Sequence, residues 1–199
     1  IDKGIFPDFL KETEIIRNDT SWKAKAPPKD LEKRWVEITG PTDKKMLING
    51  LNSKADIFMA DFEDANSPTI DNMFSGQDNL RRAIDKTLVL STKEKTYRLN
   101  DQVAVLTVRP RGWHLPEQHF FVDETPISGS LFDVGLFLYH NAKTLISNNT
   151  GPYFYLAKLE SHEEARLWND VFEFCETYLQ LPKGSIRCTV LIETVTAAF

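Results

Sequence analysis

Four segments of the sequence share one pattern, an apolar run that ends in charged side chains. They are residues 55–65, 103–111, 151–161 and 185–194. Runs of this length without strict alternation of polar and apolar positions are typical of parallel strands that are buried on both faces. The pattern therefore predicts a parallel β-sheet with at least these four strands.

Helical patterns with apolar residues on one side separate the predicted strands. The helices are expected at residues 42–53, 76–88, 130–147 and 161–179. Ser130 is the expected N-cap of the third helix, and Ser161 with Glu164 forms an S-x-x-E capping box at the fourth. A short helix is expected within 7–17 and a hairpin over 93–102. Strands that alternate with helices indicate an α/β fold with a parallel sheet.

Composition excludes several classes of protein. The chain has 199 residues, of which 41% are hydrophobic and 27% charged, and this is an ordinary globular composition. A net charge of −5 argues against a nucleic-acid-binding protein, and no apolar run reaches the ~18 residues of a membrane span. Cys175 and Cys188 have the spacing of two reduced thiols rather than a metal motif.

Charged residues follow each predicted strand, where α/β proteins place their chemistry. These residues are Asp61, Glu63 and Asp64, then Arg109 and Arg111, then Lys158 and Glu160, and finally Glu193. Carboxylates without His or Cys partners favour a hard cation such as Mg²⁺. An arginine beside such a site suits a substrate carboxylate or a developing oxyanion. Together they suit the handling of a small keto or aldehyde acid.

Each of these residues also has a structural interpretation. The acids at 61–64 are typical of a helix N-terminus, where carboxylates meet a favourable dipole. Glu193 could belong to a structural ion pair, and Arg109-Pro110-Arg111 could be a surface turn. The functional interpretation depends on the recurrence of the pattern at four strand ends in series. The four histidines show no zinc-binding spacing.

Several longer segments resemble the shorter, A-type malate synthases. They are FMADFEDANSPT, VRPRGWHLPE, ISGSLFDVGLFLYHN, GPYFYLAKLESHEEARLWNDVF, LPKGSIRCTVLIETVTAAF and, near the N-terminus, VEITGPTDKKMLINGLNS. The resemblance covers nearly the whole chain. It implies a TIM (β/α)₈ barrel that condenses acetyl-CoA with glyoxylate and hydrolyses the thioester to malate and CoA.

The resemblance also implies roles for individual residues. Arg109 matches the family's active-site arginine, which binds glyoxylate and stabilises the enolate, and this leaves Arg111 as a secondary loop residue. Glu193 matches the glutamate that binds Mg²⁺. Asp61 and Glu63 match acids that act near the metal through bound water. Asp64, Lys158 and Glu160 are expected near the substrate.

Family members are longer than this chain, so the resemblance implies that only part of the fold is present. Residues 1–54 are expected to form an N-terminal helical arm with a leading helix, and residues 55–199 about the first four barrel strands. The second metal ligand, the catalytic-base aspartate and the C-terminal helical domain are expected beyond Phe199. Residues 1–199 alone are therefore expected to be inactive. A bacterial cytoplasm is the expected location, with a peroxisome or glyoxysome as the alternative.

Two other functions fit part of the pattern. A lyase that resembles the citrate lyase β-subunit and cleaves a C–C bond of an acyl-CoA would share the acids and the arginine at the strand ends. The RPRGWHLPE and VEITGP segments favour malate synthase over it. A non-catalytic barrel fragment that serves as an assembly surface is the alternative from a different class.

Overall fold

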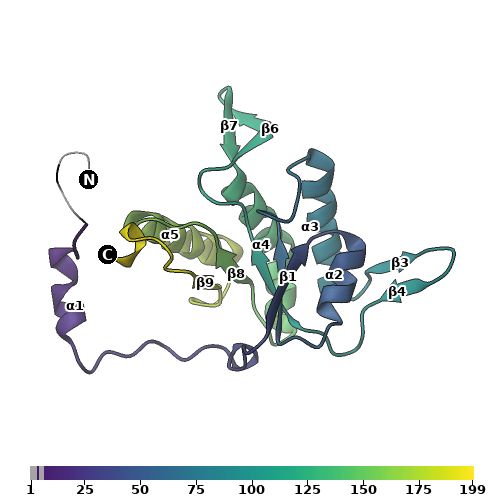
Figure 1. The fold of residues 1–199 in the computed structure, drawn as a ribbon, viewed down its shortest axis with the longest axis horizontal. Coiled ribbons are helices and arrows are strands. Elements are labelled where there is room, and N and C mark those ends of the chain that lie inside the picture. The colour runs from purple at the N-terminus through teal and green to yellow at the C-terminus, as the bar shows by residue number, and fades with distance from the viewer. Residues whose placement is uncertain (1–3, 5–6) are drawn as a thin grey trace.

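A single parallel sheet forms the centre of the molecule. The structure is a computed structural model that describes residue 4 and residues 7–199. The sheet contains β1 (Glu37–Pro41), β2 (Ile57–Asp61), β5 (Val105–Arg109), β8 (Tyr153–Leu156) and β9 (Arg187–Val190), side by side in chain order (Figure 1). An order that never reverses is that of a barrel wall, whereas a doubly wound sheet reverses at a switch point. The wall is not closed within the described residues.

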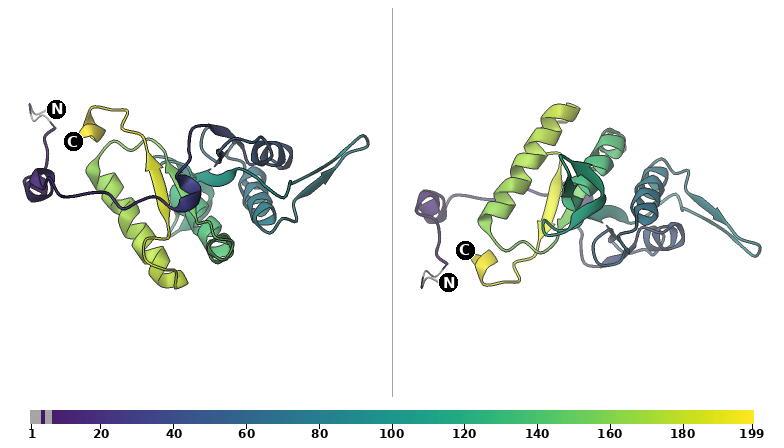
Figure 2. Two further views of the ribbon diagram at one scale, coloured as in Figure 1. Left: turned by 90° about the horizontal axis from the view of Figure 1, so that it is seen from below. Right: turned by 90° about the horizontal axis from the view of Figure 1, so that it is seen from above.

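Four long helices connect these strands. They are α2 (Lys44–Leu51), α3 (Ile70–Ile84), α4 (Gly129–Ser147) and α5 (His162–Leu179). Each helix packs against the next one in the chain, so together they form an outer layer beside the sheet (Figure 2). None of the helices in the described part of the chain is both long and apolar enough to cross a membrane.

Two hairpins and several short helices lie outside the central sheet and its helix layer. Two antiparallel hairpins, one of β3 (Val89–Ser91) with β4 (Thr96–Arg98) and the other of β6 (Pro116–Val122) with β7 (Thr125–Ser128), project from it (Figure 1). The remaining elements are short: η1 (Lys11–Thr13), α1 (Glu14–Asn18), η2 (Lys29–Leu31) and η3 (Thr196–Ala198).

The hydrophobic core lies between the sheet and the helix layer. Alternate strand residues point to opposite faces, so Phe58, Val108 and Phe154 share the helix-facing side and are all essentially inaccessible to solvent. The ring of Phe154 meets that of Phe137 on α4 edge-on, with ring centroids 5.6 Å apart. Asp61 and Arg109 lie an odd number of residues from Phe58 and Val108, so they belong to the opposite face.

The strands were predicted well, with one omission. All four predicted strands occur, but β1 is a fifth strand in the segment expected to be a helical arm. Its sequence, Glu-Ile-Thr-Gly-Pro, is short and mostly polar, so it lacks the apolar run of a strand buried on both faces. Among the described residues β1 pairs only with β2, at the edge of the sheet. The division of the chain at residue 54 stays a prediction.

The ends of three helices, α3, α4 and α5, differ from the predictions. The N-cap of α4 is Ser128, whose hydroxyl accepts from the N–H of Leu131, and not Ser130. Thr69 caps α3, which begins six residues before the predicted start at 76 and ends at Ile84, four residues before the predicted end at 88. At α5, Ser161 accepts from the Glu164 N–H as predicted, but the Glu164 carboxylate accepts from the Glu160 N–H, so only half of the capping box forms.

Candidate active site

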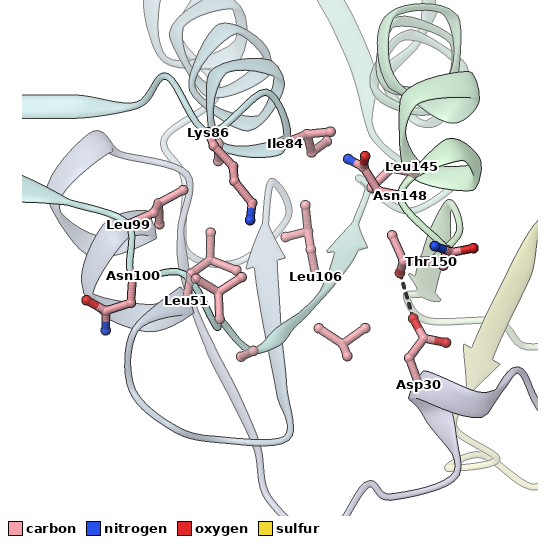
Figure 3. A pocket seen from close by; sticks show the side chains of 15 residues that line it. Asp30, Leu51, Ile84, Lys86, Leu99, Asn100, Leu106, Leu145, Asn148 and Thr150 are labelled. Atoms are coloured by element: carbon pink, nitrogen blue, oxygen red, sulfur yellow. Dashed lines mark hydrogen bonds between the residues drawn. The ribbon is translucent and has the colours of Figure 1, made fainter.

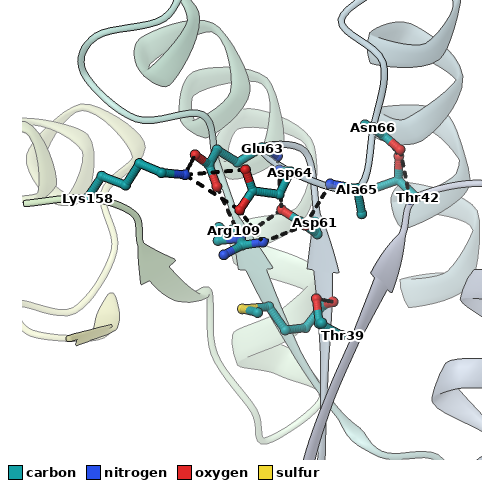
Figure 4. A network of polar contacts seen from close by, with 10 residues as sticks. Thr39, Thr42, Asp61, Glu63, Asp64, Ala65, Asn66, Arg109 and Lys158 are labelled. Carbon is teal, nitrogen blue, oxygen red and sulfur yellow. Dashed lines mark hydrogen bonds and ion pairs between the residues drawn. The ribbon is translucent and has the colours of Figure 1, made fainter. Parts of the chain in front are cut away.

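The carboxyl ends of β2 and β5 bring the first predicted site residues together. Asp61 ends β2, Arg109 ends β5, and the two are matched in the parallel register. Arg109 donates from Nε to Asp61 Oδ1 at 2.8 Å and from Nη2 to Oδ2 at 2.7 Å (Figure 4). This two-pronged geometry is the strongest form of a charge-assisted hydrogen bond. Hydrogen bonding to Asp61 raises the pKa of Arg109, although burial opposes the change.

The turn after β2 wraps around the Asp61 carboxylate. Its oxygens accept from the backbone N–H groups of Glu63 (2.9 Å), Asp64 (3.3 Å) and Ala65 (2.9 Å). The Asp61 side chain is 1% exposed. With two further bonds from Arg109, its acceptor capacity is largely used, so Asp61 acts as an anchor for Arg109 and for this turn.

Lys158 joins the cluster from the end of β8. Its Nζ donates to Glu63 Oε1 and lies 3.3 Å from Asp64 Oδ1 (Figure 4). The hydrogen bond with Glu63 raises the pKa of Lys158, and burial opposes it. Burial opposes ionisation of Asp64 as well, but bonding to Lys158 lowers its pKa below the usual value. Lys158 has a φ of 52°, a left-handed conformation that is uncommon for a side chain of this kind.

One oxygen of this cluster has an unused acceptor capacity. Glu63 Oε2 is buried without a hydrogen-bond partner among the described residues, and Arg109 Nε lies 3.7 Å from it. Buried polar atoms are normally paired, so an unpaired carboxylate oxygen at a strand end fits a water or a hydrated cation. The donor set suits Mg²⁺, although the described residues include no group of three or more His, Cys, Asp or Glu arranged to hold a metal.

The remaining predicted residues lie outside these contacts. The Arg111 guanidinium is buried and pairs with Asp133 and Glu117. Glu160 and Glu193 are exposed, and within the described residues the structure places neither side chain in contact with Arg109. Burial raises the pKa of Tyr155, the charge of Arg109 lowers it, and the charge of Glu193 raises it.

Sequence patterns gave no indication of three further residues around this edge. Asp133 and Glu117 are buried and hold Arg111, and neither follows a strand of the main sheet. Tyr155, on β8, is half-buried on the same face as Asp61 and Arg109. Its position in an apolar run suggested only a core residue.

Aromatic packing supports the loop that follows Arg111. The rings of Trp113 and Trp168 pack together at a tilt of 35°, with centroids 4.3 Å apart, and this contact joins the loop to α5. The indole N–H of Trp113 is buried without an acceptor in the described residues.

A second, apolar pocket lies at the opposite end of β5. It has a volume of about 310 Å³ and is lined by Leu51, Ile84, Val105, Leu145 and neighbours (Figure 3). Asp30 closes one side, where its carboxylate accepts from Thr150 at 2.6 Å and from the hydroxyl of Tyr153 at 2.8 Å. Because it opens beside the first residue of the strand, it is separate from the site around Arg109.

Comparison with known proteins finds a TIM barrel domain where the structure has strands in the order of a barrel wall. Residues 105–199 match the family model "Malate synthase, TIM barrel domain". The chain is 57% identical over 198 residues to the malate synthase of Myxococcus xanthus and 50% identical over 202 residues to the glyoxysomal malate synthase of Candida tropicalis. These alignments cover 99% and 100% of this chain.

The chain is also similar to a relative that is named bifunctional. The bifunctional glyoxylate cycle protein of Caenorhabditis elegans is 58% identical over 196 residues, which are 98% of this chain and 20% of that protein. The chain spans 36% of the Myxococcus xanthus enzyme and 37% of the Candida tropicalis enzyme. Nearly its whole length is thus similar to malate synthases, and residues 105–199 match the TIM barrel domain of that family.

Proposed function

We propose that the full-length protein containing this chain condenses acetyl-CoA with glyoxylate and hydrolyses the resulting thioester to malate and CoA. The observation that carries the proposal is the arginine at the end of β5, fixed by Asp61 and facing a cluster of carboxylates. The relatives named malate synthase support the same reaction. In this role the protein is an acyltransferase of the glyoxylate cycle.

Arg109 is the residue of this chain to which we assign the central role. Its Nε and Nη2 are held by Asp61, and among the hydrogen bonds of the described residues none uses Nη1. The side chain is 17% exposed, so a small oxoacid could reach it. A fixed guanidinium would bind the glyoxylate carboxylate and stabilise the negative charge that develops on the enolate oxygen.

The carboxylates of the site fit a Mg²⁺ ion. We propose that Glu193 binds it and that Glu63 contacts it through water with the unpaired Oε2. Asp61 contributes less to metal binding than Glu63 does, because its oxygens already accept five hydrogen bonds. When bound, Mg²⁺ would polarise the aldehyde of glyoxylate. Lys158, Asp64 and Glu160 would shape the charge around the substrate, and the catalytic base would come from elsewhere in the protein.

The proposal is tested by steady-state kinetics of the full-length protein. CoA release is measured with acetyl-CoA and glyoxylate, and cleavage of malyl-CoA or citramalyl-CoA is measured in parallel. Arg109→Lys keeps the charge but loses the planar fork. We expect kcat to fall by well over tenfold, as on loss of an oxyanion donor. Normal kinetics of this variant, or faster lyase activity than condensation, would overturn the proposal.

Metal dependence provides a second test. Glu193→Gln should shift the Mg²⁺ activation curve to at least about tenfold higher concentration, because a neutral amide binds a hard cation weakly. Glu94→Gln, on the exposed turn between β3 and β4, is the matched control and should leave the curve unchanged. Equal curves for the two variants would remove Glu193 from the metal site. We also propose that residues 1–199 alone show no turnover.

The relatives point to two cellular locations for the protein. One relative is bacterial and another is named glyoxysomal. We propose a bacterial cytoplasm, or a glyoxysome or peroxisome as the alternative.

A further inference from the structure

We propose that three buried charged residues, Arg111, Asp133 and Glu117, act together as a clamp that positions Arg109 for catalysis. These three residues form the Arg111 clamp. The proposal rests on the function proposed above for Arg109. It gives Arg111 a task different from substrate binding, and it adds two residues from outside the strand ends.

Both the backbone and the side chain of Arg111 are fixed. Asp133 Oδ2 accepts from the Arg111 backbone N–H at 3.0 Å and from Nε at 2.9 Å, and Oδ1 accepts from Nη2 at 2.8 Å. Glu117 Oε2 lies 2.8 Å from Nη1. The Arg111 carbonyl in turn accepts from the hydroxyl of Ser130 at 2.7 Å. The loop therefore cannot shift at this residue without breaking several bonds at once.

The three side chains of the clamp are buried, so each charge depends on its partners in place of water. The side chains of Arg111, Glu117 and Asp133 are 2%, 1% and 0% exposed. Burial opposes the ionisation of Glu117, but hydrogen bonds from the His119 N–H and ring and the charge of Arg111 lower its pKa below the usual value. Replacing a buried ion pair by apolar residues is often neutral or stabilising, so such a network is weak evidence for stability. Its directional contacts are better suited to holding one loop geometry.

The connection from the clamp to Arg109 is short and stiff. Only Pro110 separates the two arginines, and its ring fixes φ and removes the N–H. Arg109 is also tied to the turn after β2, because its carbonyl accepts from the Phe62 N–H at 2.9 Å. A shift of the Arg111 backbone would therefore move Arg109 by a similar distance. A misplacement of about 1 Å in a catalytic group can lower a rate about a hundredfold.

Helix α4 is built to approach the clamp closely. Asp133 lies in its first turns, and the helix begins at Gly129. A Cβ at Gly129 would lie 2.7 Å from the carbonyl oxygen of Leu115, closer than real Cβ contacts, and 3.0 Å from Arg111 Nε, which is tighter than most of them. The absence of a side chain at this position lets the helix end sit against the arginine.

A double-mutant cycle in the full-length protein tests whether the clamp acts through Arg109. Asp133→Asn should lower kcat about tenfold or more, with the KM for acetyl-CoA changed less than about twofold. In the Arg109→Lys background the same change should lower kcat by less than about twofold, because the positioned group is already lost. Glu117→Gln, a milder change, should follow the same pattern if Asp133→Asn fails to fold.

A matched control separates positioning from general destabilisation. Glu176 is another buried carboxylate, and it holds the loop before β9 by accepting from the N–H groups of Gly184 and Ile186. Glu176→Gln should lower the thermal midpoint without changing kcat at a temperature where the protein is folded. Thermal unfolding is recorded for every variant.

The outcomes distinguish the two proposals. If Arg109→Lys is impaired but the clamp variants lower kcat equally in both backgrounds, the clamp proposal fails and the proposed function stands. If Glu176→Gln lowers kcat as much as Glu117→Gln, the clamp has only a structural role. If Arg109→Lys has normal kinetics, the role of Arg109 fails and the clamp proposal fails with it.

Discussion

Arg109 and Asp61 end neighbouring parallel strands at matched register positions, and their side chains form a two-pronged ion pair. The pair joins β5 to the turn after β2, because Asp61 also accepts three backbone N–H groups of that turn. The sheet register therefore fixes the guanidinium from the side of β2, while the loop held by the Arg111 clamp follows it on the other side. This is the arrangement that a site on rigid elements requires.

Asp61→Asn should impair both stability and catalysis. An amide offers one acceptor oxygen and places an NH₂ group against donors, so Arg109 and the turn lose partners that are buried. We expect a loss of about 3 kcal/mol in the free energy of unfolding and a fall in kcat of at least about tenfold. Urea denaturation and steady-state kinetics measure the two effects. Asp123→Asn, on the exposed turn between β6 and β7, is the control. It should change the free energy of unfolding by less than about 0.5 kcal/mol and should leave kcat unchanged. Equal stability of both variants would contradict the anchoring role.

Lys158→Met should destabilise the protein chiefly through its partner. The Lys158 side chain is 46% exposed, but Glu63 is 2% exposed and would keep a buried charge without its closest cation. We expect a loss of about 1–3 kcal/mol, of which a second change, Glu63→Gln, restores at least half. Urea denaturation of the two variants measures this difference. A double variant less stable than Lys158→Met would show that the buried charge is not the cause.

The sequence was sufficient to place Asp61 and Arg109 together, but not to find the Arg111 clamp. Both residues follow long apolar runs, and parallel strands bring their ends to one edge. Asp133 lies inside a helix and Glu117 in a hairpin strand, where a buried carboxylate has no sequence signature. Their contacts with Arg111 depend on how α4 packs over the loop, which is a tertiary effect. β1 escaped prediction for a related reason, since its place in the sheet comes from pairing with β2 rather than from an apolar run.

The pH dependence of stability should reveal the contact between Tyr153 and Asp30. Burial and the hydrogen bond to Asp30 raise the pKa of Tyr153 to about 12. The folded state therefore keeps this proton up to about pH 12, whereas the unfolded chain releases it near pH 10. The contribution of the buried phenol is complete below about pH 10 and is lost as the pH rises toward 12.

Tyr153→Phe tests this assignment. The free energies of unfolding of the wild type and the variant are compared at about pH 9 and about pH 11.5. The wild type should lose more stability than Tyr153→Phe over this interval, so the gap between them should narrow. A constant gap would mean that Tyr153 does not release its proton preferentially on unfolding.

Two glycines in helices should respond in opposite ways to alanine. A Cβ at Gly50 of α2 would lie 2.2 Å from the ring of Phe58, so Gly50→Ala should cost about 1–3 kcal/mol by overpacking. Gly135 of α4 is exposed and has open space around it, so Gly135→Ala should stabilise the helix by about 0.5–1 kcal/mol. Thermal or urea denaturation measures both, and the same sign of change for both would contradict the packing described for α2.

The close contact of Trp113 with Trp168 gives the loop after Arg111 its own optical reporter. Trp113 lies two residues beyond Arg111, and its ring is held 4.3 Å from that of Trp168. Trp22 and Trp35 are exposed, so their emission differs in wavelength from that of this pair. Any movement of the loop on ligand binding will alter the overlap of the two indoles. Intrinsic fluorescence can therefore follow the loop in real time without an added label, and Trp168→Phe identifies the signal.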